Sequence, residues 1–92
     1  MADTVRRTLN IVNEKGLHAR ASAKLVEVVE DHDADATVSK DGLDASGDSI
    51  MGLLMLAASR GTSIEVETSG PEAEKLADAL EALVADRFGE DF

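Results

Sequence analysis

Residues 62–68 constrain the fold most strongly, because apolar and charged side chains alternate at their centre, over residues 64–67. Ile64, Val66 and Thr68 fall on one side of an extended chain, and two glutamates fall on the other. Residues 4–12 show a similar alternation. Strands of this kind have one face for a core and one for water, which is typical of an antiparallel sheet covered on a single side.

Three other stretches have the apolar spacing of helices, each with one side suited to a core. The first helix is predicted over residues 19–31. The second is predicted over residues 50–59, with Ser49 as its N-cap and a glycine just after its end. The third begins with Pro71 in the N1 position. Its apolar stripe follows three-four spacing: Ala73, Leu76, Ala77, Leu80, Leu83 and Val84.

Residues 36–39 read as a short strand, which an Asp-Gly turn joins to a return strand. Leu43 and Ala45 of that return strand are expected to face the core, whereas residues 88–92 read as a short acidic tail. The predicted order is β-α-β-β-α-β-α. The sequence therefore predicts one α+β domain over residues 1–92, with four antiparallel strands and three helices on one face of the sheet.

Composition excludes several classes of function. Nine basic and nineteen acidic residues give a net charge of −10, which disfavours nucleic acid and anionic membranes as partners. The absence of cysteine excludes disulfides and cysteine-based zinc sites. The first seven residues lack the apolar region of a signal peptide, and residues 50–58 are about half the roughly 20 residues that cross a bilayer. A soluble, cytoplasmic protein is expected.

His18 stands between a glycine turn and the start of the first helix, where Ser, Thr, Asp or Asn normally caps. The first helical N–H groups are therefore expected to lack a side-chain partner and, with the helix dipole, to form an anion site. A phosphoryl group on His18 would lie over these donors, and Arg20 would add a planar cation. When only the position of His18 is considered, an ordinary exposed histidine without a functional role is the commoner case.

The second predicted helix is apolar all round, although a thin domain can bury only one side of it. Met51 and Met55 are therefore expected to form a flexible surface patch, the alternative being that they fill gaps in the core. Ser49 can be a plain N-cap, or a phosphate there could switch docking at the patch. His32 lies among scattered carboxylates, which is more typical of a solvated turn than of a metal site.

Residues 16–20, Gly-Leu-His-Ala-Arg, resemble the active-site signature of the HPr family, the phosphocarriers of the bacterial phosphotransferase system. Residues 49–54, Ser-Ile-Met-Gly-Leu-Leu, resemble a second family motif at the expected interval. Where the family often has a proline after the arginine, this chain has Ala21. Residues 53–56 and 64–67 are similar to the nitrogen-related branch, often called NPr.

The resemblance implies an open-faced β-sandwich and a carrier that is not itself an enzyme and needs no cofactor or metal. It implies that enzyme I, charged by phosphoenolpyruvate, phosphorylates Nδ1 of His18 with help from Arg20, and that an EIIA-type domain accepts the group. Ser49 matches the position modified by a dedicated HPr kinase/phosphorylase. The alternative is an interaction module that Ser49 phosphorylation controls, with His18 idle. The residues expected to dock partners are Leu17, Met51, Gly52, Leu53 and Met55.

Overall fold

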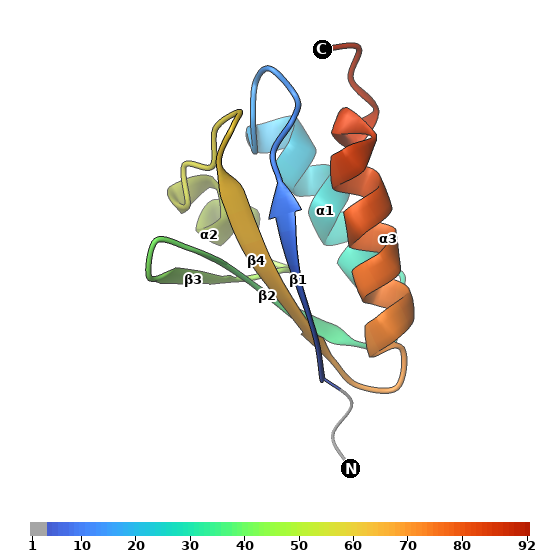
Figure 1. Cartoon of the computed structure of the whole chain (residues 1–92). Coiled ribbons are helices and arrows are strands. Elements are labelled where there is room, and N and C mark those ends of the chain that lie inside the picture. The colour runs from blue at the N-terminus through green and yellow to red at the C-terminus, as the bar shows by residue number, and fades with distance from the viewer. Residues whose placement is uncertain (1–3) are drawn as a thin grey trace.

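The computed structural model describes residues 4–92; residues 1–3 of the predicted domain lie outside the described part. Its elements follow the predicted order, with a short 3₁₀ turn, η1, after the last helix (Figure 1). They are β1 (Thr4–Asn10), α1 (Ala19–Glu30), β2 (Asp35–Lys40), β3 (Leu43–Ser46), α2 (Ile50–Met55), β4 (Ser63–Ser69), α3 (Ala73–Ala85) and η1 (Arg87–Gly89).

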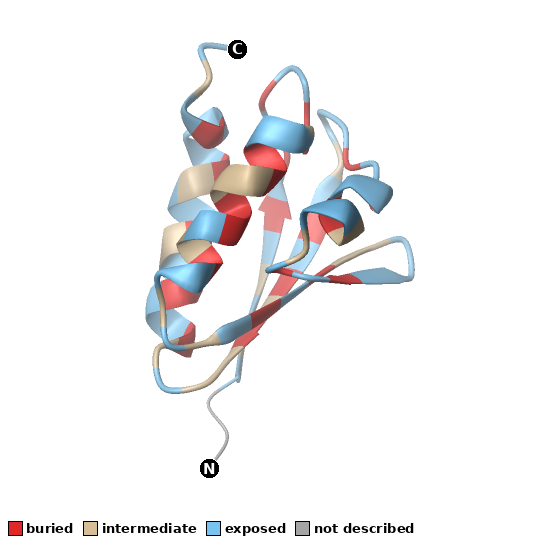
Figure 2. Ribbon diagram, turned by 180° about the vertical axis from the view of Figure 1, so that it is seen from behind, coloured by how far each residue is buried: buried red, intermediate tan, exposed pale blue. Residues whose placement is uncertain are grey.

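The four strands form one antiparallel sheet in the order β1-β4-β2-β3. Strand β4 is interior, so its Val66 lies between Arg7 of β1 and Val38 of β2. Ile64, Val66 and Thr68 are buried while the glutamates between them are not, which confirms the alternation found in the sequence. The helices lie on one face of the sheet (Figure 2). The predicted α+β fold is thereby confirmed.

The core lies between this face of the sheet and the helices, because each helix turns its apolar stripe inward. Leu25 of α1 and Leu76 and Leu80 of α3 are fully buried against Val66 and its neighbours. Ala21, at the position where the family often has proline, is also fully buried. Within residues 4–92, no helix has both the length and the apolar character needed to span a lipid bilayer.

Two predicted helix boundaries and one burial prediction were wrong. Helix α2 ends at Met55 instead of residue 59, because Ala57 adopts a left-handed φ of 51° that no helix continues through. Helix α3 begins at Ala73, two residues after Pro71. Leu43 was expected in the core but is 56% exposed, since it begins the edge strand β3 at the tip of a hairpin that extends past the helices (Figure 1).

Candidate functional site

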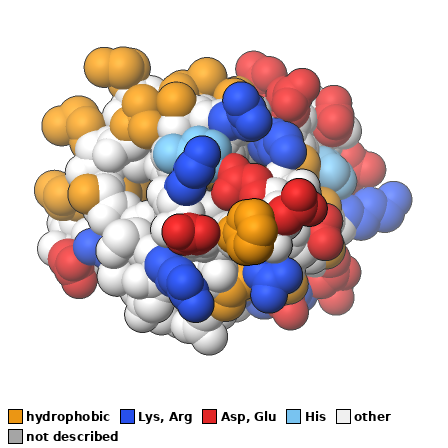
Figure 3. Space-filling model, turned by 90° about the horizontal axis from the view of Figure 1, so that it is seen from above, with side chains coloured by type: hydrophobic (Ala, Val, Ile, Leu, Met, Phe, Trp, Pro, Cys, Tyr) orange, Lys and Arg blue, Asp and Glu red, His pale blue; other side chains and the backbone are white. Residues whose placement is uncertain are grey.

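One end of the molecule carries an open hollow, formed by the loop before α1 and by the chain that follows α3. Its volume is about 590 Å³. Figure 3 looks down on this end and shows lysine and arginine side chains interspersed with carboxylates, with apolar side chains to one side. The hollow brings together the predicted site residues His18 and Arg20 with charged neighbours, namely Lys15, Lys24, Glu90 and Asp91.

His18 is the N-cap of α1, with an extended backbone at φ −76° and ψ −177°. Its carbonyl accepts the N–H of Ser22 at 2.8 Å, which closes the first turn of the helix. The ring nitrogen Nδ1 accepts the backbone N–H of Arg20 at 3.2 Å. The predicted position at the helix start is confirmed. The expectation that the first amides lack a side-chain partner was wrong, because the histidine ring itself occupies one of them.

The loop that delivers His18 is packed tightly against a second loop. Gly16 has a left-handed φ of 66°, and the peptide beside it leaves no room for a side chain. A Cβ on Gly16 would overlap the carbonyl oxygen of Ala58 and lie 2.9 Å from Cα of Ser59. The next residue, Leu17, is buried and donates its N–H to the same Ala58 carbonyl at 2.8 Å. Close backbone contact therefore fixes the position from which His18 projects.

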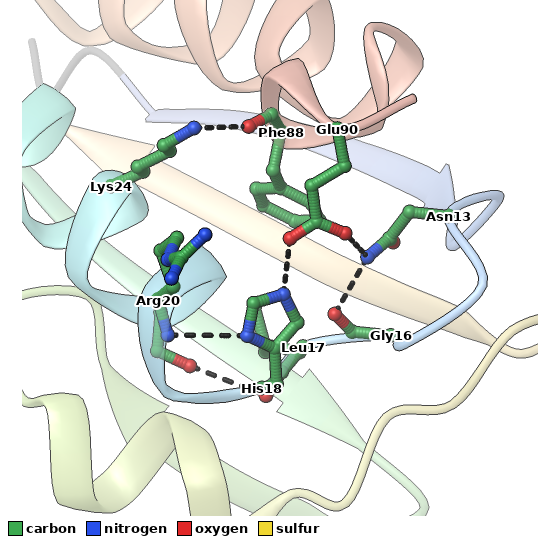
Figure 4. A network of polar contacts seen from close by, with 9 residues as sticks. Asn13, Gly16, Leu17, His18, Arg20, Lys24, Phe88 and Glu90 are labelled. Carbon is green, nitrogen blue, oxygen red and sulfur yellow. Dashed lines mark hydrogen bonds and ion pairs between the residues drawn. The ribbon is translucent and has the colours of Figure 1, made fainter. Parts of the chain in front are cut away.

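Glu90 is a site residue that the sequence reasoning missed. One of its carboxylate oxygens contacts Nε2 of His18, and the other accepts a 3.0 Å hydrogen bond from Nδ2 of Asn13 (Figure 4). The same Nδ2 atom donates to the carbonyl of Gly16 at 2.8 Å. Asn13 is fully buried. Its two hydrogen bonds connect the glycine turn to the Glu90 carboxylate and, through that carboxylate, to the histidine.

Residues 87–92, called here the C-terminal segment, hold Glu90 in place. The sequence reasoning described residues 88–92 as a short acidic tail, yet Phe88 is completely buried in the core. Arg87 and Phe88 are both left-handed, with φ of 56° and 54°, which turns the chain sharply after α3. Phe88 lies four residues after Val84 of the apolar stripe, and this spacing was the one signal that could have revealed it.

Two further bonds attach the C-terminal segment to the rest of the site. Lys24 of α1 donates from Nζ to the carbonyl of Phe88 at 2.6 Å. The N–H of Glu14 donates to the carbonyl of Phe92 at 2.9 Å. The segment is therefore fixed on both sides of Glu90, and its carboxylate has little freedom to leave the histidine.

The hydrogen-bond partners of the ring indicate its tautomer. Because Nδ1 accepts a hydrogen bond, the proton of the neutral ring is on Nε2, which donates it to Glu90. Burial alone would raise the pKa of Glu90, but hydrogen bonds from Asn13 and His18, together with the positive charge of Lys15, lower it below its ordinary value. Glu90 is therefore an anion at neutral pH.

Arg20 lies at the exposed edge of the site. Its backbone N–H binds the histidine ring, while its guanidinium makes no hydrogen bond or ion pair with the described part of the chain. The five N–H donors of a guanidinium suit the oxygens of a phosphoryl group. The cation is thus available to an anion that arrives beside Nδ1.

The second motif forms helix α2. Ser49 is its N-cap, as predicted, and its Oγ accepts the N–H of Gly52 at 3.1 Å. Met51 and Met55 are 71% and 74% exposed, so the alternative that they fill the core was wrong. The apolar surface that these residues share with their neighbours is called here the α2 patch, and it comprises Ile50, Met51, Leu54 and Met55.

Two of the predicted docking residues do not reach the surface. Leu17 is only 4% exposed and Leu53 is completely buried, because both point from their elements into the shared core. They support the site and the α2 patch from beneath and cannot contact a partner directly. Gly52 is half-buried, and a Cβ there would lie 3.2 Å from the Cβ of Ala45 on β3. Of the five docking predictions, only Met51 and Met55 lie openly on the surface.

His32 takes no part in this site. Its Nδ1 lies 2.7 Å from the carbonyl of Val28 near the end of α1, a carbonyl that also accepts the N–H of Asp31 at 3.3 Å. Over residues 4–92, no group of three or more histidine, aspartate or glutamate side chains is placed to hold a metal ion. The structure therefore gives His32 a capping role.

Comparison with known proteins shows the family of the chain. The family model described as the PTS HPr component phosphorylation site matches residues 5–86. The chain is 44% identical to the phosphocarrier protein HPr of Cupriavidus necator over 94% of this chain and 97% of that one. It is 40% identical to the phosphocarrier protein NPr of Escherichia coli K12 over 96% and 99% of the two chains.

Solved structures give the same result for the fold. The crystal structure of HPr-C-His from Thermoanaerobacter tengcongensis superposes with a TM-score of 0.90 at 32% identity, covering 96% of this chain and 99% of that one. The phosphocarrier protein HPr from Bacillus anthracis gives a TM-score of 0.84 at 34% identity, with 88% and 96% covered.

Proposed function

The chain belongs to the HPr family of phosphocarrier proteins of the phosphotransferase system, and we propose that His18 is the residue that carries the phosphoryl group. The observation that carries the proposal is the pair of different partners that the two ring nitrogens of His18 have. Its Nδ1 holds a lone pair at the amino end of α1, while Nε2 is hydrogen-bonded to Glu90. A ring nitrogen that bears a lone pair is the nucleophile that phosphoryl transfer requires, and attack exchanges the hydrogen bond of that lone pair with the Arg20 N–H for a bond to phosphorus.

The surroundings of Nδ1 favour an anion once transfer has occurred. A phosphoryl oxygen can replace the ring nitrogen as acceptor of the Arg20 N–H, and the positive end of the α1 dipole attracts the negative charge. The guanidinium of Arg20, free of other partners in the described part of the chain, can turn onto the other oxygens. These local donors oppose the net charge of −10, which by itself would repel a phosphoryl group.

In this proposal the protein acts as a carrier between two other proteins and is not itself an enzyme. Enzyme I, charged by phosphoenolpyruvate, would be the donor, and the histidine of an EIIA-type domain would be the acceptor. His18 is partly exposed, with 26% of its side chain accessible, so a partner's reactive atom can reach it. The α2 patch offers an apolar docking surface, because flexible methionine side chains adapt to more than one partner.

The test is labelling by enzyme I. The protein is incubated with phosphoenolpyruvate and the enzyme I of its own organism, and the product is examined for an acid-labile, base-stable adduct. His18→Ala should abolish the label, whereas His32→Ala, the matched control, should retain it. Full labelling of His18→Ala would refute the assignment of the site.

A second role, regulation at Ser49, is favoured by one specific observation. Ser49 is only partly buried at the start of α2, next to Ile50 of the α2 patch. A phosphate on its oxygen would interact well with the helix amino end but would place negative charge beside an apolar docking surface. We therefore propose that an HPr kinase/phosphorylase, where the organism has one, slows transfer at His18 by modifying Ser49.

An acid-stable label from ATP and the kinase, lost in Ser49→Ala, would support this regulation. Equal rates of labelling by enzyme I for wild type and Ser49→Asp would count against it. An acid-stable label together with no label at all from enzyme I would instead favour the alternative, an interaction module in which His18 is idle.

The acceptor is proposed to belong to the nitrogen-related branch. Glu27 and Glu30 are exposed on α1, so this side of the molecule suits a partner with a basic docking face. Phosphorylated protein should therefore donate faster to an EIIA protein of the nitrogen-related type than to one of the sugar type. Faster transfer to the sugar-type protein would assign the carrier to sugar uptake.

A further inference from the structure

We propose that Glu90 is a positioning residue for phosphoryl transfer, which holds the His18 ring with Nδ1 facing the donor and offsets the charge that the ring gains. This inference rests on the proposed function of His18. It names a role for a residue outside both sequence motifs, 72 positions from the histidine.

The first argument is geometric. An imidazole that is free to rotate about χ2 can present either nitrogen, and χ2 of histidine is a broad, weakly restrained torsion. Here the two nitrogens have different partners, the Arg20 N–H on Nδ1 and the Glu90 carboxylate on Nε2. Turning the ring over about χ2 would place the C–H at Cδ2 against the Arg20 N–H and the C–H at Cε1 against the Glu90 carboxylate, so both hydrogen bonds would be lost. Glu90 and Arg20 together therefore permit one orientation, with Nδ1 as the nucleophile.

The second argument concerns how firmly Glu90 itself is held. Its other oxygen is bound by Asn13, and its segment is attached by the buried ring of Phe88 and by Lys24 on the Phe88 carbonyl. Ordering a glutamate side chain costs up to about 2 kcal/mol when it is free beforehand. Glu90 is already ordered in the folded protein, because the C-terminal segment is held by these contacts. Its carboxylate therefore acts on the ring without further loss of side-chain entropy.

The third argument follows the charge during transfer. The lone pair of Nδ1 forms the N–P bond while the bond from phosphorus to the donor atom breaks, and that bonding pair leaves with the donor. The proton on Nε2 stays there, so the ring becomes a cation. The carboxylate of Glu90 already touches that N–H, and it therefore gains a full ion pair as the transition state is approached. An interaction that strengthens in this way raises the rate of the chemical step more than it raises affinity for the donor.

Other charged groups also face this hollow. Lys15 from the loop and Arg20 and Lys24 from α1 are cationic, whereas Glu14 and Asp91 are anionic. Among the charged side chains of residues 4–92 that face the hollow, Glu90 is the one that contacts the ring nitrogen Nε2. Asp91, its neighbour on the same segment and in the same hollow, provides a matched control for the loss of one negative charge.

The first measurement uses unphosphorylated protein and needs no donor. Nitrogen-edited NMR should detect a slowly exchanging Nε2–H of His18 in the wild type and in Asp91→Asn. In Glu90→Gln this signal should shift upfield and exchange faster, because a neutral amide is a weaker acceptor than a carboxylate. In Glu90→Ala it should be lost to exchange. An unchanged signal in Glu90→Ala would overturn the proposal.

The second measurement separates positioning from a purely structural role. In labelling by enzyme I, Glu90→Gln should lower kcat about tenfold, which corresponds to the loss of one charge-assisted bond of about 1.4 kcal/mol. Its KM should change less than twofold, and Asp91→Asn should resemble the wild type in both constants. Changed NMR signals with an unchanged kcat would overturn the proposal, because the contact would then serve the fold alone.

The two proposals fail in different ways. If His18→Ala is labelled as well as the wild type, the carrier site is elsewhere, although the Nε2–H signal of His18 still reports its contact with Glu90. If His18→Ala loses the label and Glu90→Gln keeps full kcat, His18 is the carrier and Glu90 has no part in transfer.

Discussion

Nζ of Lys24 donates a 2.6 Å hydrogen bond to the carbonyl of Phe88, a residue 64 positions further along the chain. The bond joins α1, which begins at the histidine, to the turn that follows α3. It satisfies a carbonyl next to a fully buried aromatic ring, at a point where two consecutive residues are left-handed. The stability of the fold and the arrangement of the site therefore depend on the same short segment.

Phe88 should be a large contributor to stability. Replacing Phe88, which has no exposed surface, by alanine leaves a cavity, and we expect a loss of about 3–5 kcal/mol in the free energy of unfolding measured with urea. Phe92→Ala is the matched control, since Phe92 is 74% exposed and should cost less than about 0.5 kcal/mol. Similar losses for both variants would show that Phe88 does not pack as described.

Gly16 should tolerate alanine much less well than Gly42, although both have left-handed φ angles, 66° and 84°. At Gly42 a Cβ meets nothing within 4 Å, so only the strain of about 1–2 kcal/mol is expected. At Gly16 the backbone of residues 58–59 blocks the Cβ, so the total loss should be about 2–5 kcal/mol. Urea unfolding of the two variants measures the difference, and equal losses would disprove close packing of the loops.

Ser49 should stabilise α2 whether or not it is modified. Ser49→Ala removes the acceptor of the Gly52 N–H and should cost about 1 kcal/mol in urea unfolding. Ser49→Asp should retain nearly the wild-type stability, because aspartate is an equally good N-cap. If the aspartate variant lost as much as the alanine variant, the capping bond would not be the source of the effect.

The α2 patch should matter for docking and little for folding. Met51→Ala should leave the free energy of unfolding within about 0.5 kcal/mol of the wild type, because the side chain is 71% exposed. The same change should raise the KM for labelling by enzyme I. Leu53→Ala is the contrasting variant, and burial of Leu53 predicts a loss of about 2–5 kcal/mol. An unchanged KM for Met51→Ala would argue against docking through this patch.

The ionisation of Glu90 should make the free energy of unfolding fall as the pH is lowered. Its pKa is lowered in the folded protein, so the folded state favours the carboxylate, and the resulting stabilisation is complete above the pKa that Glu90 has in the unfolded chain. The stabilisation is lost as the pH falls through the lower pKa of the folded state. Glu90→Gln should therefore be less stable than the wild type at pH 7 and should approach it at pH 3. Urea unfolding at the two pH values checks this, and a constant difference would contradict it.

Much of the fold could be predicted because its signals are local. The alternation of Ile64 and Val66 and the stripe of Leu76 and Leu80 each arise within one element, where the period of the backbone decides which side chains share a face. The same patterns left one side of every strand polar, which required the helices to cover a single face. His18 and Ser49 were likewise placed at helix starts, because capping depends on a few neighbouring residues.

The wrong predictions concern side chains whose exposure depends on packing between elements that are far apart in the sequence. Leu43 has the right parity for the core, yet the hairpin carries it beyond the helices. Leu17 and Leu53 sit within the two motifs, but burial against other elements keeps them from the surface. A motif records which residues occur together and carries no information about which of their side chains remain accessible.

The sequence by itself determined the elements, the one-sided sheet and the position of the histidine, because hydrophobic period and capping are set by residues within a turn or two of each other. Only the tertiary structure decided which carboxylate faces that histidine. The acidic residues near the end of the chain are indistinguishable by local pattern. Burial of Phe88 and the bond from Lys24 select Glu90 from among them, because these long-range contacts fix where the C-terminal segment runs.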